Sequence, residues 1–149
     1  MPRIRTETSD DSARERVLSV PEYVRLLAAS PRWLERLEIA VYETAIGRGD
    51  LLGLTWQQLD EAEGLIRIKG GRKKTGVKQV APITHALIPV IAELRDEHQK
   101  VRNLENLVFT RGGQLISISA LRKAFEKAMR EAKFEDFHFH DFRHTAKTI

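Results

Sequence analysis

Three histidines and an arginine crowd the last twelve residues of the sequence, at positions 138, 140, 144 and 143. His140 and Arg143 are three residues apart, so on a helix they would share one face. A phosphate group is bound well by an imidazole together with a bidentate guanidinium. This spacing therefore indicates half of a phosphoryl-transfer site. The alternative is an amphipathic helix in which Phe139 and Phe142 face the core and the polar residues are only solvated.

A second group of cations lies between residues 67 and 78. Six of these twelve residues are basic and none is acidic. The basic residues are Arg67, Lys69, Arg72, Lys73, Lys74 and Lys78. This density of positive charge is typical of a surface that contacts nucleic-acid phosphates, and we expect DNA contacts from Arg72, Lys73 and Lys78. The alternative is a solvated hairpin tip, because lysines keep exposed turns soluble.

Composition narrows the class of protein. With 149 residues, of which 42% are hydrophobic and 31% charged, the chain fits one soluble globular domain. It has no apolar run long enough for a membrane span, and no secretory signal is recognisable at its start. The absence of cysteine excludes disulfides and thiolate metal sites. The net charge of +4 is a modest excess, so the location of the basic residues matters more than their number.

The hydrophobic pattern predicts helices around one small antiparallel sheet, which is an α+β fold with mainly α-helical content. Residues 1–18 are polar and charged, and we expect a flexible lead-in there, followed by the folded domain over 19–149. Helices are expected over 19–30, 33–44, 51–54, from about 88 through 94, and 119–129. Extended residues over 65–69 and 79–83, separated by glycines, predict two paired strands.

Polar residues predict how several of these helices begin. Ser19 and Glu22 have the spacing of a capping box, in which each side chain bonds the other residue's backbone N–H. Asp50 and Ser119 are expected to cap the third and fifth helices. Each cap fixes where its helix starts and therefore which residues face the core.

Four stretches, taken in order, resemble the catalytic domain of the tyrosine recombinases, the phage integrase family. Residues 42–54 resemble the family's Thr-Gly-(apolar)-Arg-x-x-Glu box, and Lys74-Thr-Gly76 with the 80–83 segment resembles its Lys-Thr-Gly hairpin and following strand. Residues 107–109 resemble its Val-Phe strand, and His140-Asp-Phe-Arg143 resembles its His-x-x-Arg box. The resemblance covers residues 19–149, and the last box is its most specific part.

The resemblance implies an enzyme that breaks and rejoins DNA through a tyrosine, with no metal and no cofactor. Two arginines neutralise the phosphate oxygens, a hairpin lysine acts as general acid, and a histidine assists proton transfer. Matched by position, the lysine is Lys74, the histidine is His140 and the second arginine is Arg143. Lys73 is a neighbour able to replace Lys74 after a small shift, and His144 is expected to add a DNA contact.

The resemblance also implies partners and a setting. The expected partners are double-stranded DNA, further copies of this chain and full-length recombinase protomers, and no membrane. The expected location is the bacterial cytoplasm, on the nucleoid when the protein is bound to DNA. The expected process is DNA recombination or integration of a mobile element.

Two departures from the family pattern predict weak or absent catalysis. The first arginine of the family falls on Gly47, and Arg48 is one place late, which on a helix turns a side chain by about 100°. Arg48 is therefore only a provisional catalytic residue. The family's nucleophilic tyrosine lies well beyond the His-x-x-Arg box, whereas Tyr23 and Tyr42 lie in early helices. We therefore expect a truncated core, without the amino-terminal DNA-clamping domain, that binds DNA phosphate and does not cut.

Two other classes of protein stay open. One is a non-catalytic DNA-binding or regulatory protein that reuses the fold. The other is a metal hydrolase that uses His138, His140, Asp141 and His144 as ligands. The missing C-terminal part also predicts an exposed apolar patch, and hence self-association, near Leu121, Phe125 and Phe142.

Overall fold

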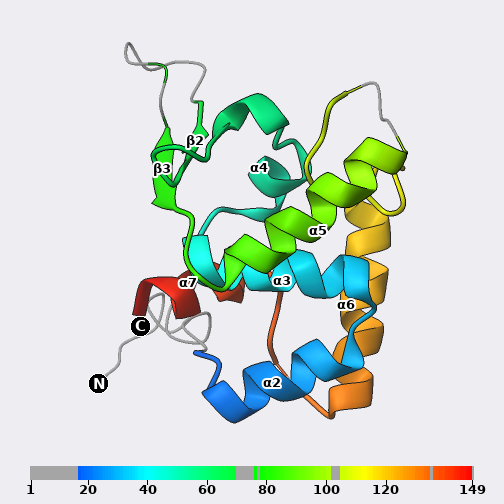
Figure 1. Cartoon of the computed structure of the whole chain (residues 1–149). Helices are drawn as coiled ribbons and strands as arrows, with labels where there is room; N and C mark the ends of the chain where they lie inside the picture. Colours follow the sequence, from blue (N-terminus) through cyan, green and yellow to red (C-terminus); the bar gives the residue numbers. More distant parts are fainter. Residues whose placement is uncertain (1–16, 70–75, 77, 102–104, 135, 149) are drawn as a thin grey trace.

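The computed structural model describes residues 17–69, 76, 78–101, 105–134 and 136–148 (Figure 1). The helices are α2 (Val20–Ala29), α3 (Arg32–Thr44), α4 (Arg48–Leu52), α5 (Leu87–Lys100), α6 (Ile118–Ala132) and α7 (Asp141–Thr148). The strands are β1 (Leu59–Asp60), β2 (Leu65–Ile68) and β3 (Gln79–Pro82), with a short 3-10 turn at Trp56–Gln58. In the described part of the chain, no helix has the length and hydropathy to cross a bilayer.

Helix α3 is the central element of the fold. It contacts α4, α5, α6 and α7, and Figure 1 shows α5 crossing it while α7 lies near its C-terminal end. Leu34, Leu37 and Val41 recur along α3 at helical spacing and are fully buried. Each such side chain contributes about 1.5–3 kcal/mol through burial, so this stripe holds the surrounding helices in place.

The sheet is small and antiparallel, with strand order β1-β2-β3. Ile66 on β2 is paired with Ala81 on β3, and both are buried. Ile66 and Ile68 face the core while Arg67 between them is half-buried, which is the alternation of a strand with one covered face. The two predicted strands and the mainly helical α+β fold are confirmed. Strand β1, two residues long, was missed.

One predicted helix cap is confirmed and two are wrong. The Ser19–Glu22 capping box is present at the start of α2. Helix α6 is capped by Ser117, whose Oγ accepts a hydrogen bond from the Ala120 N–H at 3.0 Å, so Ser119 is already inside the helix. Helix α4 follows Gly47, which places Asp50 in the first turn rather than at the cap.

A cluster of phenylalanines joins α6, the 134–139 segment and α7. The ring of Phe125 lies 5.2 Å from that of Phe139 and 6.0 Å from that of Phe142, and Phe137 lies 5.2 Å from Phe142. Phe125 and Phe142 are therefore buried, as is Leu121. The predicted exposed patch at these three residues is wrong, because Phe137 and Phe139 pack within the same cluster and exclude water from it.

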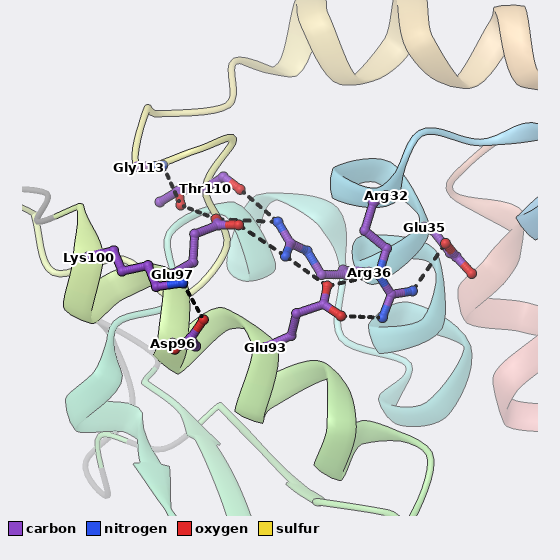
Figure 2. A network of polar contacts seen from close by, with 9 residues as sticks. All are labelled: Arg32, Glu35, Arg36, Glu93, Asp96, Glu97, Lys100, Thr110 and Gly113. Atoms are coloured by element: carbon purple, nitrogen blue, oxygen red, sulfur yellow. Dashed lines mark hydrogen bonds and ion pairs between the residues drawn. The ribbon is translucent and has the colours of Figure 1, made fainter.

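A polar network fastens α3 to α5 (Figure 2). The Arg36 side chain is only 5% exposed, and its Nη1 donates to Glu93 at 3.0 Å and to Glu97 at 3.2 Å. Its Nη2 also donates to the Thr110 carbonyl at 3.4 Å. Arg32 binds Glu93 from a more exposed position, and this hydrogen bond lowers the pKa of Glu93 below its ordinary value. The network therefore joins α3, α5 and the segment that precedes α6.

Glu38 is a buried acid on the same helix. Its carboxylate is fully buried, accepts a hydrogen bond from the Ser30 Oγ at 3.0 Å, and leaves Oε1 without a partner among the described residues. Burial raises the pKa of Glu38 well above the ordinary value of 4.5. Burial therefore favours the protonated carboxyl more than it would be favoured in an exposed glutamate.

We expect the replacement Glu38→Gln to change how stability depends on pH. Because the folded-state pKa is raised, the stabilising contribution is complete at low pH and is lost as the pH rises through that pKa. The amide cannot ionise, so the variant should keep this contribution at neutral and alkaline pH. Urea unfolding from pH 4 to 9 measures it, with exposed Glu131→Gln as the control. Parallel pH curves for wild type and Glu38→Gln would contradict the expectation.

Candidate phosphate-binding site

Helix α7 carries Arg143 and is held on both sides of it. Phe142 is fully buried in the phenylalanine cluster, and Thr145 is fully buried three residues later. The Thr145 Oγ1 accepts a hydrogen bond from the Leu18 N–H at 3.1 Å, and Leu18 is itself part of the core. These contacts fix both the position and the rotation of α7.

The Arg143 guanidinium is fixed by a backbone oxygen. Its Nε donates to the Ala45 carbonyl at 2.8 Å. Ala45 ends α3 in a left-handed conformation, with φ 61° and ψ 18°, a geometry that normally favours glycine. Within the described residues, the terminal nitrogens of Arg143 have no hydrogen-bond or ion-pair partner. They are therefore the donors that remain for a ligand.

Gly47 faces Arg143. A Cβ atom at position 47 would lie 3.6 Å from the Arg143 Cδ and 3.7 Å from its Nη1, which is ordinary van der Waals contact. The backbone there is extended, with φ −68° and ψ 160°, so any residue type fits. The position that resembles the family's first arginine is thus directed at Arg143, and glycine leaves that side of the guanidinium uncovered.

Arg48 and His140 lie on one cavity of about 350 Å³, whose floor is formed by the phenylalanine cluster and α6. His138 lines the same cavity, and Arg143 does not. Arg48 and His140 are exposed, and His140 occupies the turn that leads into α7, where its carbonyl accepts the Arg143 N–H at 3.2 Å. The structure therefore places Arg48 with His140, and Gly47 with Arg143.

Of the basic cluster, the structure describes Arg67 and Lys69 at one end and Lys78 at the other, and the Arg67 Nη1 donates to the Asp60 Oδ2 at 2.7 Å. The Lys78 Nζ lies 2.9 Å from the Asp50 Oδ2, and the Gln79 Nε2 donates to the Thr44 carbonyl at 3.3 Å. Arg72, Lys73 and Lys74 lie outside the described residues. His144 is half-buried on α7, next to Arg143. The DNA contacts expected of these residues stay predictions.

The metal-hydrolase alternative has no support in this geometry. In the described residues, no three His, Cys, Asp or Glu side chains are grouped closely enough to hold a metal ion. The Asp141 carboxylate instead accepts the backbone N–H of His138 at 2.9 Å, which caps the start of α7. Asp141 is buried in this role.

Tyr23 and Tyr42 form a stacked pair between α2 and α3, with ring centroids 3.8 Å apart. Burial, followed by the charge of Glu43, raises the pKa of the Tyr23 hydroxyl. Such a hydroxyl is harder to ionise than a free tyrosine. The stacked rings pack α2 against α3.

The sequence reasoning missed the two groups that fix the cations. The Ala45 carbonyl orients Arg143, and Asp50 holds Lys78 rather than capping a helix. One signal for the first was available, because Thr44-Ala45 matches the Thr-Gly of the family box and a glycine there indicates a left-handed turn. The pairing of Asp50 with Lys78 had no signal in the sequence, because the two residues are 28 positions apart.

Comparisons with known proteins agree on one family. The tyrosine recombinase XerC-like protein of Caldanaerobacter subterraneus subsp. tengcongensis is 26% identical, over 77% of this chain and 38% of its own length. The crystal structure of XerA recombinase matches with a TM-score of 0.74 at 17% identity, over 89% of this chain and 49% of that chain. The chain thus spans half or less of the length of these proteins.

Lambda integrase has the same fold. Its structure bound to DNA matches with a TM-score of 0.66 at 18% identity, over 87% of this chain and 49% of that chain. Its structure as a dimer bound to a COC′ core site also gives 0.66, at 21% identity, over 89% of this chain and 51% of that chain. The model of the phage integrase family matches residues 16–149. The chain therefore belongs to the phage integrase family, the tyrosine recombinases.

Proposed function

We propose that this chain is the phosphate-binding part of a site-specific tyrosine recombinase and that its ligand is the backbone of double-stranded DNA. The observation that carries the proposal is the fixed guanidinium of Arg143, whose Nε is bonded to Ala45 and whose terminal nitrogens are unpaired among the described residues. Family membership and the DNA-bound structure of lambda integrase support the choice of ligand.

The proposed chemistry follows from the donors that remain. With Nε occupied, the Arg143 guanidinium presents Nη1 and Nη2 to the two nonbridging oxygens of one phosphate, which is a bidentate charge-assisted contact. His140 is proposed to assist proton transfer, Lys74 to protonate the leaving oxygen, and Arg48 to bind DNA beside His140. Arg72, Lys73, Lys78 and His144 are proposed to contact the DNA backbone, which raises affinity without reading sequence.

We further propose that residues 1–149 bind DNA without cutting it. The stacked and half-buried Tyr23 and Tyr42 support this part of the proposal. Cutting would need a tyrosine from sequence outside these residues or from a recombinase protomer bound beside this one. Lambda integrase is a dimer on its core site, which supports self-association on DNA as the proposed assembly. The proposed setting is mobile-element DNA in the bacterial cytoplasm.

A salt series with labelled duplexes, combined with a gel assay for covalent protein–DNA adducts, tests the proposal. We expect the logarithm of the binding constant to fall linearly with the logarithm of salt concentration, because each phosphate contact releases condensed cations. We also expect no adduct. Binding that is indifferent to salt, or a covalent adduct, would contradict the proposal. Protection of one defined sequence at moderate salt would instead favour the regulatory alternative.

A further inference from the structure

Two contacts clamp the start of strand β3 onto the 44–50 segment, which comprises the end of α3, the turn at Gly47 and the first turn of α4. The Gln79 Nε2 donates to the Thr44 carbonyl, and the Lys78 Nζ lies 2.9 Å from the Asp50 Oδ2. Further along β3, Ala81 is buried against β2, so the strand itself is anchored in the fold. Lys78, the last residue of the basic cluster, is thus tied to the segment that faces Arg143.

This clamp contributes little to stability. The side chains of Lys78 and Asp50 are 51% and 31% exposed, and an exposed ion pair is worth about 0–1 kcal/mol. Its consequence is geometric. A lysine side chain has four rotatable carbons and three donor hydrogens, so an unpaired Lys78 would sample many positions. Asp50 binds one donor and leaves the other two for a ligand, at a defined place beside the first turn of α4.

Asp50 is also placed where it would otherwise oppose DNA binding. It lies three residues after Gly47 in the first turn of α4, and a Cβ at position 47 would point at Arg143. A carboxylate near a phosphate site repels the phosphate, unless it serves to hold a cation toward it. The pairing with Lys78 gives Asp50 that second role.

We propose that Asp50 is a positioning residue that holds the Lys78 ammonium at the edge of the Arg143 site, where Lys78 binds a DNA phosphate. This inference rests on the proposed function, because it names a further cation for the same DNA-binding surface. The proposal therefore predicts that Asp50 strengthens DNA binding, although its negative charge alone would weaken it. If Asp50 acted only through its negative charge, removing that charge would strengthen DNA binding.

The variant Asp50→Asn tests the proposal because it keeps the size of the side chain and removes the charge. We expect it to weaken duplex binding by roughly three- to tenfold and to lower the salt slope toward that of Lys78→Ala. The matched control is Asp96→Asn, which also removes one negative charge and one ion pair to a lysine. Its partner is Lys100, and both side chains lie on the exposed face of α5. The control should bind DNA as tightly as wild type or slightly more tightly. Thermal unfolding of each variant checks that the fold is intact.

The double variant Asp50→Asn with Lys78→Ala separates positioning from a structural role. If Asp50 acts through Lys78, the double variant binds no more weakly than Lys78→Ala alone. Additive losses, or an Asp50→Asn protein that binds as tightly as wild type, would overturn the proposal. Arg143→Ala in the same assay tests the proposed function separately. If Arg143→Ala weakens binding and Asp50→Asn does not, only the inference about Asp50 fails.

Discussion

Replacing Arg143 with alanine is expected to weaken binding to duplex DNA by about 10- to 100-fold, the range for loss of one charge-assisted contact. The loss is large because Arg143 is held in place by Ala45 before any ligand arrives, so little side-chain freedom is lost on binding. The salt slope should fall by about one phosphate contact. Fluorescence anisotropy with a labelled duplex, measured across a salt series, provides both values.

Two variants control for charge and for shape. Arg130→Ala removes the same charge from the exposed last turn of α6, and it should change affinity far less. Arg143→Lys keeps the charge but cannot donate to Ala45 and to a phosphate through one planar group, so its affinity should be intermediate. Equal losses from Arg143→Ala and Arg130→Ala would show that the effect is bulk charge and would count against the site.

The uncovered side of the Arg143 guanidinium allows a test in which an arginine is added rather than removed. Gly47→Arg would add a second guanidinium beside the first, because a Cβ at position 47 points at Arg143 without a clash. Gly49→Arg adds the same charge two residues later, where a Cβ would have nothing within 4 Å. We expect the first variant to bind duplex DNA more tightly than the second. The advantage should shrink in an Arg143→Ala background, because two arginines on one phosphate are coupled.

Replacing Arg36 with alanine is expected to destabilise the fold by about 2–4 kcal/mol, somewhat less than the loss of one partner from a fully buried ion pair. The Arg36 side chain is almost fully buried, so its removal leaves a void and strips Glu97 of its ion-pair partner. The loss is reduced because the side chains of Glu93 and Glu97 are 43% and 28% exposed and can be hydrated. Urea unfolding measures the change.

Arg32 provides the matched comparison because it binds Glu93 from the surface. Its side chain is 45% exposed, so Arg32→Ala should cost at most about 1 kcal/mol. The contrast between the two variants isolates burial, since both remove an arginine from the same helix and from the same glutamate. Costs within experimental error of each other would mean that the network of Figure 2 is not a stabilising feature.

The features that sequence predicted well are those encoded by neighbouring residues. The Ser19–Glu22 capping box needs only residues three apart, and the stripe on α3 needs only helical spacing. The errors arose where two local solutions compete. Ser117 and Ser119 are both residues that can cap a helix, and in the structure the earlier one, Ser117, is the cap. Asp50 is suited both to a cap position and to the first turn of a helix. In the structure the cap position is Gly47, which has no side chain that could have indicated a cap in the sequence.

The site was predicted only in part because its geometry joins distant positions. The sequence led to the prediction that Arg143 and His140 bind phosphate, which stays a prediction. It did not reveal that the Ala45 carbonyl accepts a hydrogen bond from Arg143, 98 residues away. The sequence also showed the displacement of Arg48. In the structure Arg48 lines the same cavity as His140, while a Cβ at position 47 would point at Arg143. Such pairings depend on how α7 packs on α3, which no local pattern encodes.

The hydrogen bond between Leu18 and Thr145 spans 127 residues and has a consequence for the order of folding. Contacts between positions far apart in the chain form slowly, because a long loop must close before they contribute. During synthesis, α2 through α6 leave the ribosome before α7 exists. The nascent chain therefore carries the basic residues between positions 67 and 78 before it carries an oriented Arg143. Arg143 would reach its place beside the Ala45 carbonyl only once α7 has left the ribosome and packed on α3.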